Sequence, residues 1–255
     1  APTGAQSGPL MNSEEAALVK VREARLEPVV VMPVLATARF APPAAVWLRV
    51  AAAKEGLEVV AALGDPRLRG LWNRGRGQVE ARQTGLAEAR GEAVLFLDDD
   101  DLLLDPAYLY RVWRVLSREE AVVYGEGVLL LGLEEVPFAP GEVGAWLLRE
   151  NRLLASGTAL PKRTLLALGG LDGGMGDYWD WDLWLRAYKA GLPFRYLRGR
   201  GVGIRVHGGN QSYGARRAER AYYLERLCAK HGLGPLPLKD HLALAREGLG
   251  EAQSP

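Results

Sequence analysis

Four consecutive aspartates follow an apolar segment near the middle of the chain. They are Asp98 to Asp101, and they come directly after the run Ala93 to Leu97. Carboxylates placed so close together repel one another unless a neighbouring group neutralises them. A hard divalent cation such as Mg²⁺ or Mn²⁺, which shares its coordination with phosphate oxygens, is the usual solution. The alternative is a solvated acidic turn in which Asp105 caps a helix starting at Pro106, but a place at the end of a strand favours the cation.

A segment rich in Arg and Gly precedes these aspartates. It runs from Asn73 to Gly77 and continues through Arg82 towards the apolar strand. Glycine permits close approach of the backbone to a ligand, and the Arg guanidinium offers two parallel donors to a phosphate group. The segment therefore fits a diphosphate-binding loop. A surface turn followed by an ordinary amphipathic helix is the alternative, and composition alone favours it.

A tryptophan-rich segment, Trp179 to Arg186, supplies two further carboxylates. At about 100° per residue, Trp181 and Trp184 fall on one helical stripe, which is more often core than a ligand platform. Asp180 and Asp182 then point to nearly opposite flanks, so only one of them is expected to face a shared cleft. A carboxylate held beside Trp rings has a raised pKa, which suits a general base.

A single histidine, His207, follows an extended segment and precedes a Gly-rich stretch. A histidine in this position is more often a hydrogen-bonded structural residue than a metal ligand. We therefore treat it as a candidate ligand only together with the aspartates.

The elements that position these residues follow from hydrophobic patterning. Continuous apolar runs at Val29 to Ala36, Val59 to Leu63 and 93–97 indicate strands buried on both faces, and Pro42 to Lys54 and Gln78 to Arg90 have helix length. This order predicts a mostly parallel sheet covered by helices, with ligands at the carboxyl ends of the strands. The later elements expected are helices at Pro106 to Ser117, Asp180 to Ala190, Arg216 to Lys230 and His241 to Glu247, and extended segments at Ala121 to Leu133, Phe194 to Arg198 and Val202 to Val206.

Composition excludes several classes of protein. The 255 residues are 48% hydrophobic and 25% charged, as in ordinary globular proteins. A formal net charge of +1 argues against a nucleic-acid partner. The single cysteine, Cys228, excludes an internal disulfide and fits a reducing compartment. No apolar run reaches the ~18 residues of a membrane span, so we expect a cytoplasmic protein, and the excess of Arg over Lys hints at a thermophilic source.

In their order and spacing, these pieces resemble the inverting, nucleotide-sugar-dependent glycosyltransferases of family 2, from Pro28 to Ser212. Trp179 stands where the family usually has Glu, Gln83 stands where it has Asn, and Val34 and Leu35 replace polar residues. The matching pieces are Met32 to Thr37, Asp65, Asn73 to Gly85, the Asp-x-Asp motif Asp98-Asp99-Asp100, Ala155 to Thr158, Gly169 to Asp172, Trp179 to Arg186 and Arg205-Val206-His207.

The resemblance implies a GT-A, Rossmann-like α/β fold, with a central mostly parallel sheet flanked by helices and a smaller acceptor-side subregion. We accordingly divide the chain into an N-terminal extension (residues 1–27), a nucleotide-sugar-binding part (28–133), an acceptor and catalytic part (134–214) and a C-terminal helical tail (215–255). For the Arg-bearing tail, a solvated helix face is favoured over peripheral contact with the inner face of the membrane.

The resemblance also implies a role for each matching residue. Asp180 would deprotonate the acceptor hydroxyl, and a Mn²⁺ or Mg²⁺ ion would be held by Asp100 and His207. Asp98 would bind the ribose or a metal-bound water, and Arg82 would lie near the diphosphate. The remaining residues expected at the site are Pro33, Val34, Leu35, Asp65 and Asp99 for the nucleotide, and Trp179, Asp182 and Gly157 for the donor or acceptor sugar.

The predicted activity is transfer of a sugar from a nucleoside diphosphate sugar, with UDP favoured, to a hydroxyl of a glycan, lipid or small molecule. A phosphatase with an Asp-x-Asp nucleophile, a cation-dependent nucleotidyltransferase and a catalytically degenerate carbohydrate-binding protein are the alternatives. Leu102 stands where the phosphatase motif requires Thr or Val. The stretch Val34 to Phe40 lacks the Gly-rich basic loop of a nucleotidyltransferase.

Overall fold

The computed structural model describes residues 30–35, 45–51, 68–73, 75, 77–98, 100–206 and 217–248. The predicted N-terminal extension (1–27) and the strand expected at residues 59–63 lie outside these ranges. The boundaries proposed between the parts of the chain stay predictions. No helix among the described residues combines the length and the apolar character needed to cross a membrane.

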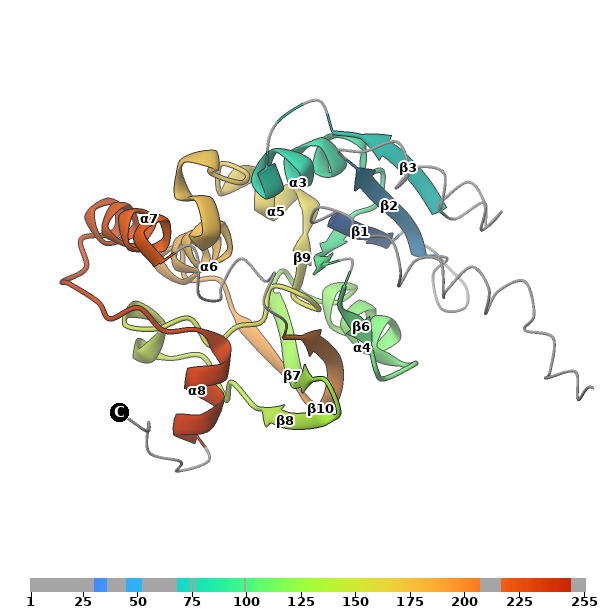
Figure 1. Ribbon diagram of the computed structural model, residues 1–255. Coiled ribbons are helices and arrows are strands. Elements are labelled where there is room, and N and C mark those ends of the chain that lie inside the picture. Colours follow the sequence, from blue (N-terminus) through green and yellow to red (C-terminus); the bar gives the residue numbers. More distant parts are fainter. Residues whose placement is uncertain are drawn as a thin grey trace, which may run out of the picture.

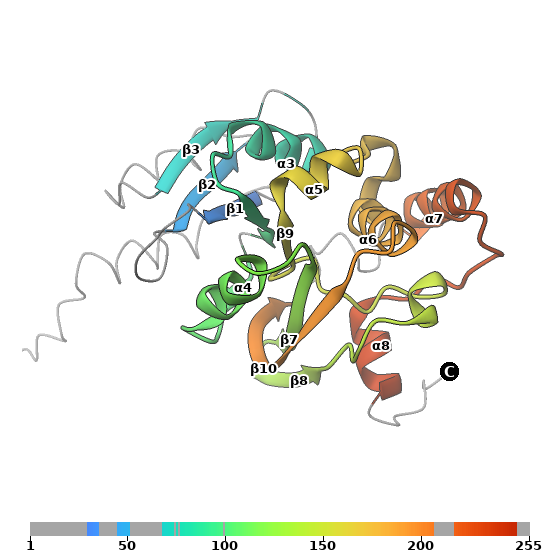
Figure 2. The same ribbon diagram turned by 180° about the vertical axis from the view of Figure 1, so that it is seen from behind.

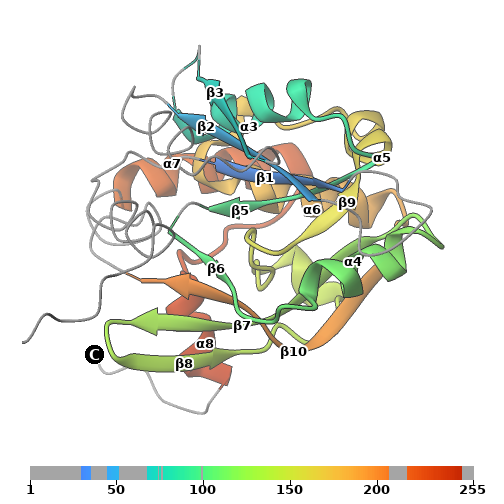
Figure 3. The same ribbon diagram turned by 90° about the vertical axis from the view of Figure 1, so that its right-hand side faces the viewer.

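The strands pair into one curled sheet, which Figure 3 shows with β1 to β3 at one end and β7, β8 and β10 at the other. The order in the sheet is β3-β2-β1-β4-β9-β7-β10-β6, with β5 beside β1 and β8 beside β7. The bounds are β1 Val30–Leu35, β2 Ala45–Ala51, β3 Leu68–Trp72, β4 Ala93–Leu95, β5 Leu97–Asp98, β6 Leu102–Leu103, β7 Val122–Leu131, β8 Glu134–Phe138, β9 Ala159–Pro161 and β10 Phe194–Arg205.

The sheet is not mostly parallel, and this corrects the prediction. Among the described strands, only β2 with β3 and β7 with β10 pair in parallel. The pairs of β4 with β1 and with β9 are antiparallel, as is that of β7 with β9. An uninterrupted apolar run shows that both faces of a strand are buried, but it carries no information on the direction of its neighbours.

Helices cover both faces of this sheet. Figures 1 and 2 show α5, α6 and α7 on one side and α4 on the other. The bounds are α3 Gly77–Glu88, α4 Tyr108–Leu116, α5 Lys162–Ala167, α6 Trp179–Lys189, α7 Arg217–His231 and α8 His241–Gly248, with short 3₁₀ helices η1 at Ala145–Leu148 and η2 at Gly173–Tyr178.

Alternation along the central strands produces two hydrophobic cores. Val94 and Phe96 point into a core shared with α3, α5, α6 and α7. Their neighbours Leu95 and Leu97 point the opposite way, into a core completed by α4 and α8. Successive side chains of a strand face opposite sides of a sheet, so a strand with an apolar residue at every position is buried on both sides. The strand that leads into the aspartates is therefore held rigidly from two directions.

One local prediction is wrong, and another is confirmed but joined into a longer element. The helix expected at 42–54 is replaced by strand β2, whose sequence carries Val46, Trp47 and Val50. β-Branched and aromatic residues favour strands, and here they prevail over the Ala-rich flanks. The two extended segments expected at 194–198 and 202–206 form one strand, β10, with register shifts around Arg200. Gly199, which has a positive φ of 98°, lies at this irregularity in the strand.

Candidate active site

The acidic turn is built by four hydrogen bonds that involve backbone and side-chain groups. The Asp101 N–H donates to the Asp98 carbonyl at 3.1 Å, which closes the turn after β5. The hydroxyl of Ser156 accepts the Asp98 N–H at 3.0 Å and donates to the Asp101 carboxylate. The other Asp101 oxygen accepts the Arg205 N–H at 3.1 Å, at the end of β10. The turn is therefore fixed between the segment that holds Ser156 and the strand that leads to His207.

Negative charge accumulates at this turn. Burial raises the pKa of Asp101 well above its usual value, and the charges of Asp98 and Asp100 raise it further. The hydrogen bonds from Ser156 and Arg205 act in the opposite direction but do not compensate. A positive ion bound at the turn would relieve this repulsion, and carboxylate oxygens are the donors that Mg²⁺ and Mn²⁺ prefer. The side chains present therefore fit a divalent cation.

The proposed metal ligands are only partly described. Asp100 belongs to the turn, while His207 lies outside the described residues. Among the residues whose positions are described, no three His, Cys, Asp or Glu side chains form a metal cluster. The assignment of Asp100 and His207 as ligands stays a prediction.

Arg82 connects the acidic turn to the start of α6. Its side chain projects from α3, is only 2% exposed and donates through Nη2 to Asp98 Oδ1. Nη1 donates to Gln78 Oε1 at 2.8 Å, and the guanidinium carbon lies 4.3 Å from the centre of the Trp179 ring. Nε has no hydrogen-bond partner in the described part of the chain. The sequence predicted that Arg82 and Asp98 serve one site, and the structure brings them into contact.

Asp180 lies in the first turn of α6 and is 7% exposed. Its Oδ1 accepts the Trp181 N–H at 2.7 Å, and its Oδ2 accepts a hydrogen bond from Asn151 Nδ2 at 2.9 Å. Burial raises the pKa of Asp180 to about 6, although these two hydrogen bonds and the charge of Arg82 lower it. A carboxylate that titrates near neutrality has the basicity expected of a general base. The sequence predicted this direction from the neighbouring Trp rings.

Comparisons with known proteins show what the chain is similar to. A family model described as Glycosyl transferase family 2 matches residues 51–130. A curated relative, the uncharacterized glycosyltransferase YwdF of Bacillus subtilis (strain 168), is 27% identical over 179 residues, which are 67% of this chain and 66% of the relative. Over the parts of the chain that they cover, both comparisons show similarity to glycosyl transferases, and the family model specifies family 2.

Two solved structures also resemble this chain. S. aureus TarS 1–349 in complex with UDP-GlcNAc superposes with a TM-score of 0.57 at 14% identity, over 72% of this chain and 56% of that one. The mixed α/β fold with its curled sheet therefore matches a glycosyltransferase. GalNAc-T7 with UDP, GalNAc and Mn²⁺ gives a TM-score of 0.49 at 16% identity, over 77% of this chain and 45% of that one. The chain spans about half of these two proteins and just under two thirds of YwdF.

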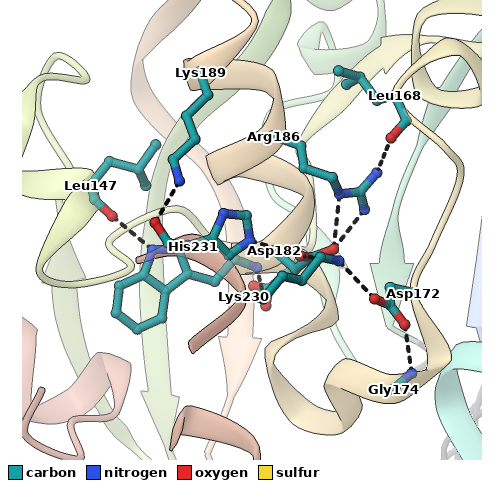
Figure 4. Close-up of polar contacts among 11 residues, drawn as sticks. Leu147, Leu168, Asp172, Gly174, Asp182, Arg186, Lys189, Lys230 and His231 are labelled. Atoms are coloured by element: carbon teal, nitrogen blue, oxygen red, sulfur yellow. Dashed lines mark hydrogen bonds and ion pairs between the residues drawn. The ribbon is translucent and has the colours of Figure 1, made fainter. Parts of the chain in front are cut away.

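Asp182, although only two residues from Asp180, has a different environment. Figure 4 shows its carboxylate between Arg186, Lys230 and His231. Lys230 Nζ lies 2.6 Å from Oδ1, His231 Nε2 lies 2.8 Å from the same oxygen, and Arg186 Nε donates to Oδ2 at 2.9 Å. Because the Asp182 side chain is 0% exposed and both oxygens are occupied, this arrangement does not support the predicted contact with a sugar.

Two other residues expected at the sugar are also buried. Trp179 is 2% exposed and packs edge-on against Phe96, with ring centroids 5.0 Å apart. Gly157 has a positive φ of 86°, and a Cβ there would meet Val202 at 2.5 Å. Both residues are therefore part of the packing next to the site, and neither presents a surface to a ligand in this structure.

The nucleotide residues predicted from the first strand lie away from the aspartates. Val34 pairs with Val94 and Leu35 with Ala93, whereas Val30 pairs with Asp98. The antiparallel register therefore directs Pro33, Val34 and Leu35 towards the beginning of β4, and does not support their contact with the ligand of Asp98. Asp65 and Asp99 lie outside the described residues.

Sequence reasoning missed Asn151 and assigned no role to Ser156 or Asp101. Ser156 lies within the segment Ala155 to Thr158 that resembles the family, and Asp101 ends the acidic run. Both residues could therefore have been identified from the sequence. Asn151 carried none, because it contacts a carboxylate 29 positions along the chain.

Proposed function

We propose that the chain transfers a sugar from a nucleoside diphosphate sugar to an acceptor hydroxyl, with inversion at the anomeric carbon and Asp180 as general base. The observation that carries this proposal is the link through Arg82. Its guanidinium contacts the acidic turn at Asp98, lies over the Trp179 ring and acts electrostatically on Asp180. A candidate anion-binding group and a candidate base are thereby held in one cluster, as a single displacement requires.

The donor side of the proposal rests on charge. Arg82 offers a guanidinium with an unpartnered, buried Nε beside the Asp98 turn, which suits a diphosphate. Asp100, with His207, would hold Mn²⁺ or Mg²⁺, and Asp98 would contact the ribose or a metal-bound water. When bound, such an ion stabilises the negative charge that develops on the leaving diphosphate.

The acceptor side of the proposal rests on Asp180. Each of its oxygens accepts one hydrogen bond and retains a second lone pair, so the carboxylate can take a proton from an acceptor hydroxyl without losing either bond. That hydroxyl oxygen forms the new bond to the anomeric carbon while the bond to the diphosphate oxygen breaks. The proton remains on Asp180 until it passes to solvent.

The first experiment is a donor panel. Purified protein is mixed with UDP-, GDP- and dTDP-sugars and Mn²⁺, and transfer, donor hydrolysis and nucleotide affinity are measured. UDP-GlcNAc is tested first, because TarS, which shares the fold, was solved with it. We expect binding of at least one nucleotide sugar and its consumption. Neither affinity nor turnover with any donor would reject the proposal.

A pair of variants tests the metal assignment. Asp100→Ala is expected to lose the Mn²⁺-dependent part of nucleotide binding. The matched control is Glu119→Gln, which removes an exposed carboxylate that pairs with Arg195 far from the turn. Equal Mn²⁺ dependence of binding in wild type, Asp100→Ala and the control would remove Asp100 from the metal site. Cleavage of a phosphate monoester in place of a nucleotide sugar would instead support the phosphatase alternative.

A further inference from the structure

The base carboxylate is held by a residue from a separate segment of the chain. Asn151 lies three residues after η1, and its Nδ2 donates to Asp180 Oδ2 at 2.9 Å. We propose that Asn151 is a positioning residue, whose amide holds the Asp180 carboxylate in the orientation from which it takes the proton of the acceptor hydroxyl. This inference rests on the proposed role of Asp180 as general base.

The orientation of the Asn151 amide is determined by its two partners. Its Oδ1 accepts the Leu153 N–H at 3.1 Å, so only the NH₂ group remains to face Asp180. A flipped amide would place its carbonyl oxygen against a carboxylate and its NH₂ group against an N–H donor. Both contacts would be repulsive, which fixes the amide in one orientation.

The segment that carries Asn151 is itself attached to α6. The indole N–H of Trp181 donates to the Leu147 carbonyl at 2.8 Å, and Trp181 is buried. Next to Asn151 in the chain, Glu150 Oε2 lies 3.4 Å from Lys239 Nζ. Because these two contacts hold the residues before Asn151 and the Leu153 N–H holds its Oδ1, the amide is preorganised and loses little conformational freedom in holding the carboxylate.

The charged and titratable groups around Asp180 come from several elements. Arg82 acts from α3 and lowers the pKa of Asp180, as do the Trp181 N–H and Asn151. Tyr178 and Asp177 lie at the end of η2, and Arg220 of α7 contacts the Tyr178 ring. A hydrogen bond to the ionised form of a carboxylate favours that form. Loss of the Asn151 donor therefore raises the pKa of Asp180, in the same direction as its burial.

A purely structural role of Asn151 would give a different result. If the amide served only to order the segment at residues 149–153, its loss would lower activity at all pH values without moving the acidic limb of the rate profile. Trp181→Phe is the matched control for this case. It removes the other link between the segment and α6, while both hydrogen bonds to the Asp180 carboxylate remain available.

The first readout is the pH dependence of kcat/KM for Asn151→Ala, Trp181→Phe and wild type. We expect the acidic limb of Asn151→Ala to move up by about one pH unit, with kcat reduced, KM for the donor unchanged and nucleotide binding retained. In Trp181→Phe the limb should stay in place. An unmoved limb in Asn151→Ala, or an equal movement in both variants, would overturn the inference.

The second readout needs no activity. The Asp180 carboxyl carbon is titrated by NMR in protein labelled with ¹³C-aspartate and assigned with Asp180→Asn. Its pKa should rise in Asn151→Ala and rise further in Asn151→Asp, which keeps the shape and adds a like charge. If wild type shows no transfer, the proposed function fails, while this titration still decides whether Asn151 controls Asp180. An unchanged titration of Asp180 in Asn151→Asp would refute the inference even if the alanine variant did not fold.

Discussion

Two carboxylates on one helix, Asp180 and Asp182, are both buried and yet have opposite properties. Burial raises the pKa of Asp180 to about 6. Burial also acts to raise the pKa of Asp182, but His231, Lys230 and Arg186 outweigh it and hold the value at about 2. Asp180 receives two hydrogen bonds from uncharged donors, and Asp182 lies among cations. The difference in pKa between Asp180, the candidate base, and Asp182, a structural anion, is therefore set by their hydrogen-bonding and charged partners and not by burial.

The largest effect is expected for Asp180→Asn. Loss of a general base lowers rates by about 100- to 10,000-fold, while nucleotide binding should persist. The same substitution should not lower stability. Because the pKa of Asp180 is higher in the folded state than in the unfolded state, its ionisation lowers the free energy of unfolding as pH rises through about 6. The variant should therefore have an unchanged or higher Tm at pH 8. Calorimetry gives the Tm and steady-state kinetics gives the rate on one preparation. A lower Tm would show that Asp180, like Asp182, stabilises the fold.

The converse variant, Asp182→Asn, should lose stability. It removes the anion that Arg186 and Lys230 share. Breaking a buried ion pair by removal of one partner costs about 3–5 kcal/mol. Denaturant unfolding followed by Trp fluorescence measures the loss. Without denaturant, where the variant is still folded, its nucleotide affinity should be close to that of wild type. A variant that keeps its stability but loses nucleotide affinity would instead place Asp182 at the ligand.

The same contrast predicts a pH window. Below about pH 6 Asp180 becomes protonated, so transfer should fall about tenfold per pH unit. The depressed pKa of Asp182 contributes stability that is complete above its ordinary value of 3.8 and is lost as pH falls through about 2. That contribution is roughly 2 kcal/mol. Between pH 6 and pH 4 the enzyme should therefore lose activity progressively while it stays folded, as circular dichroism and rates recorded together would show.

The smallest effect is expected for Lys230→Met. Lys230 is 32% exposed and also pairs with Asp172, so its loss should cost about 1 kcal/mol. The acid-unfolding midpoint should move to higher pH, because Asp182 loses one of the donors that lower its pKa. The acidic limb of the pH–rate profile for transfer should not move. A shift of that limb would show that the two carboxylates are coupled through α6.

Much of this arrangement follows from local sequence. The Trp-rich segment predicted helix α6, the raised pKa of Asp180 and the divergence of the two aspartates. The acidic run was predicted to follow directly at the end of an apolar strand, and Asp98 does end β5. Patterns of this kind are readable because helix and strand periods fix which side chains share a face.

The remaining features depend on contacts between distant segments. Ser156 meets the Asp98 N–H across 58 positions, and nothing in either local sequence indicates the other. The prediction of parallel strands failed for the same reason, because β4 pairs with β1 and β9, and not with β3 or β5, which adjoin it in the chain. The helix expected at 42–54 failed because propensity does not decide between helix and strand where partners on a sheet are available.

Gly157 sets a practical limit on redesign of this protein. Its backbone N–H and carbonyl are both occupied, by the Phe96 carbonyl and the Tyr108 hydroxyl. Libraries that randomise residues around the acidic turn to change the donor should leave the codon of Gly157 fixed and vary its neighbours instead. Almost every clone altered there would be lost to misfolding before its catalytic preference was ever sampled.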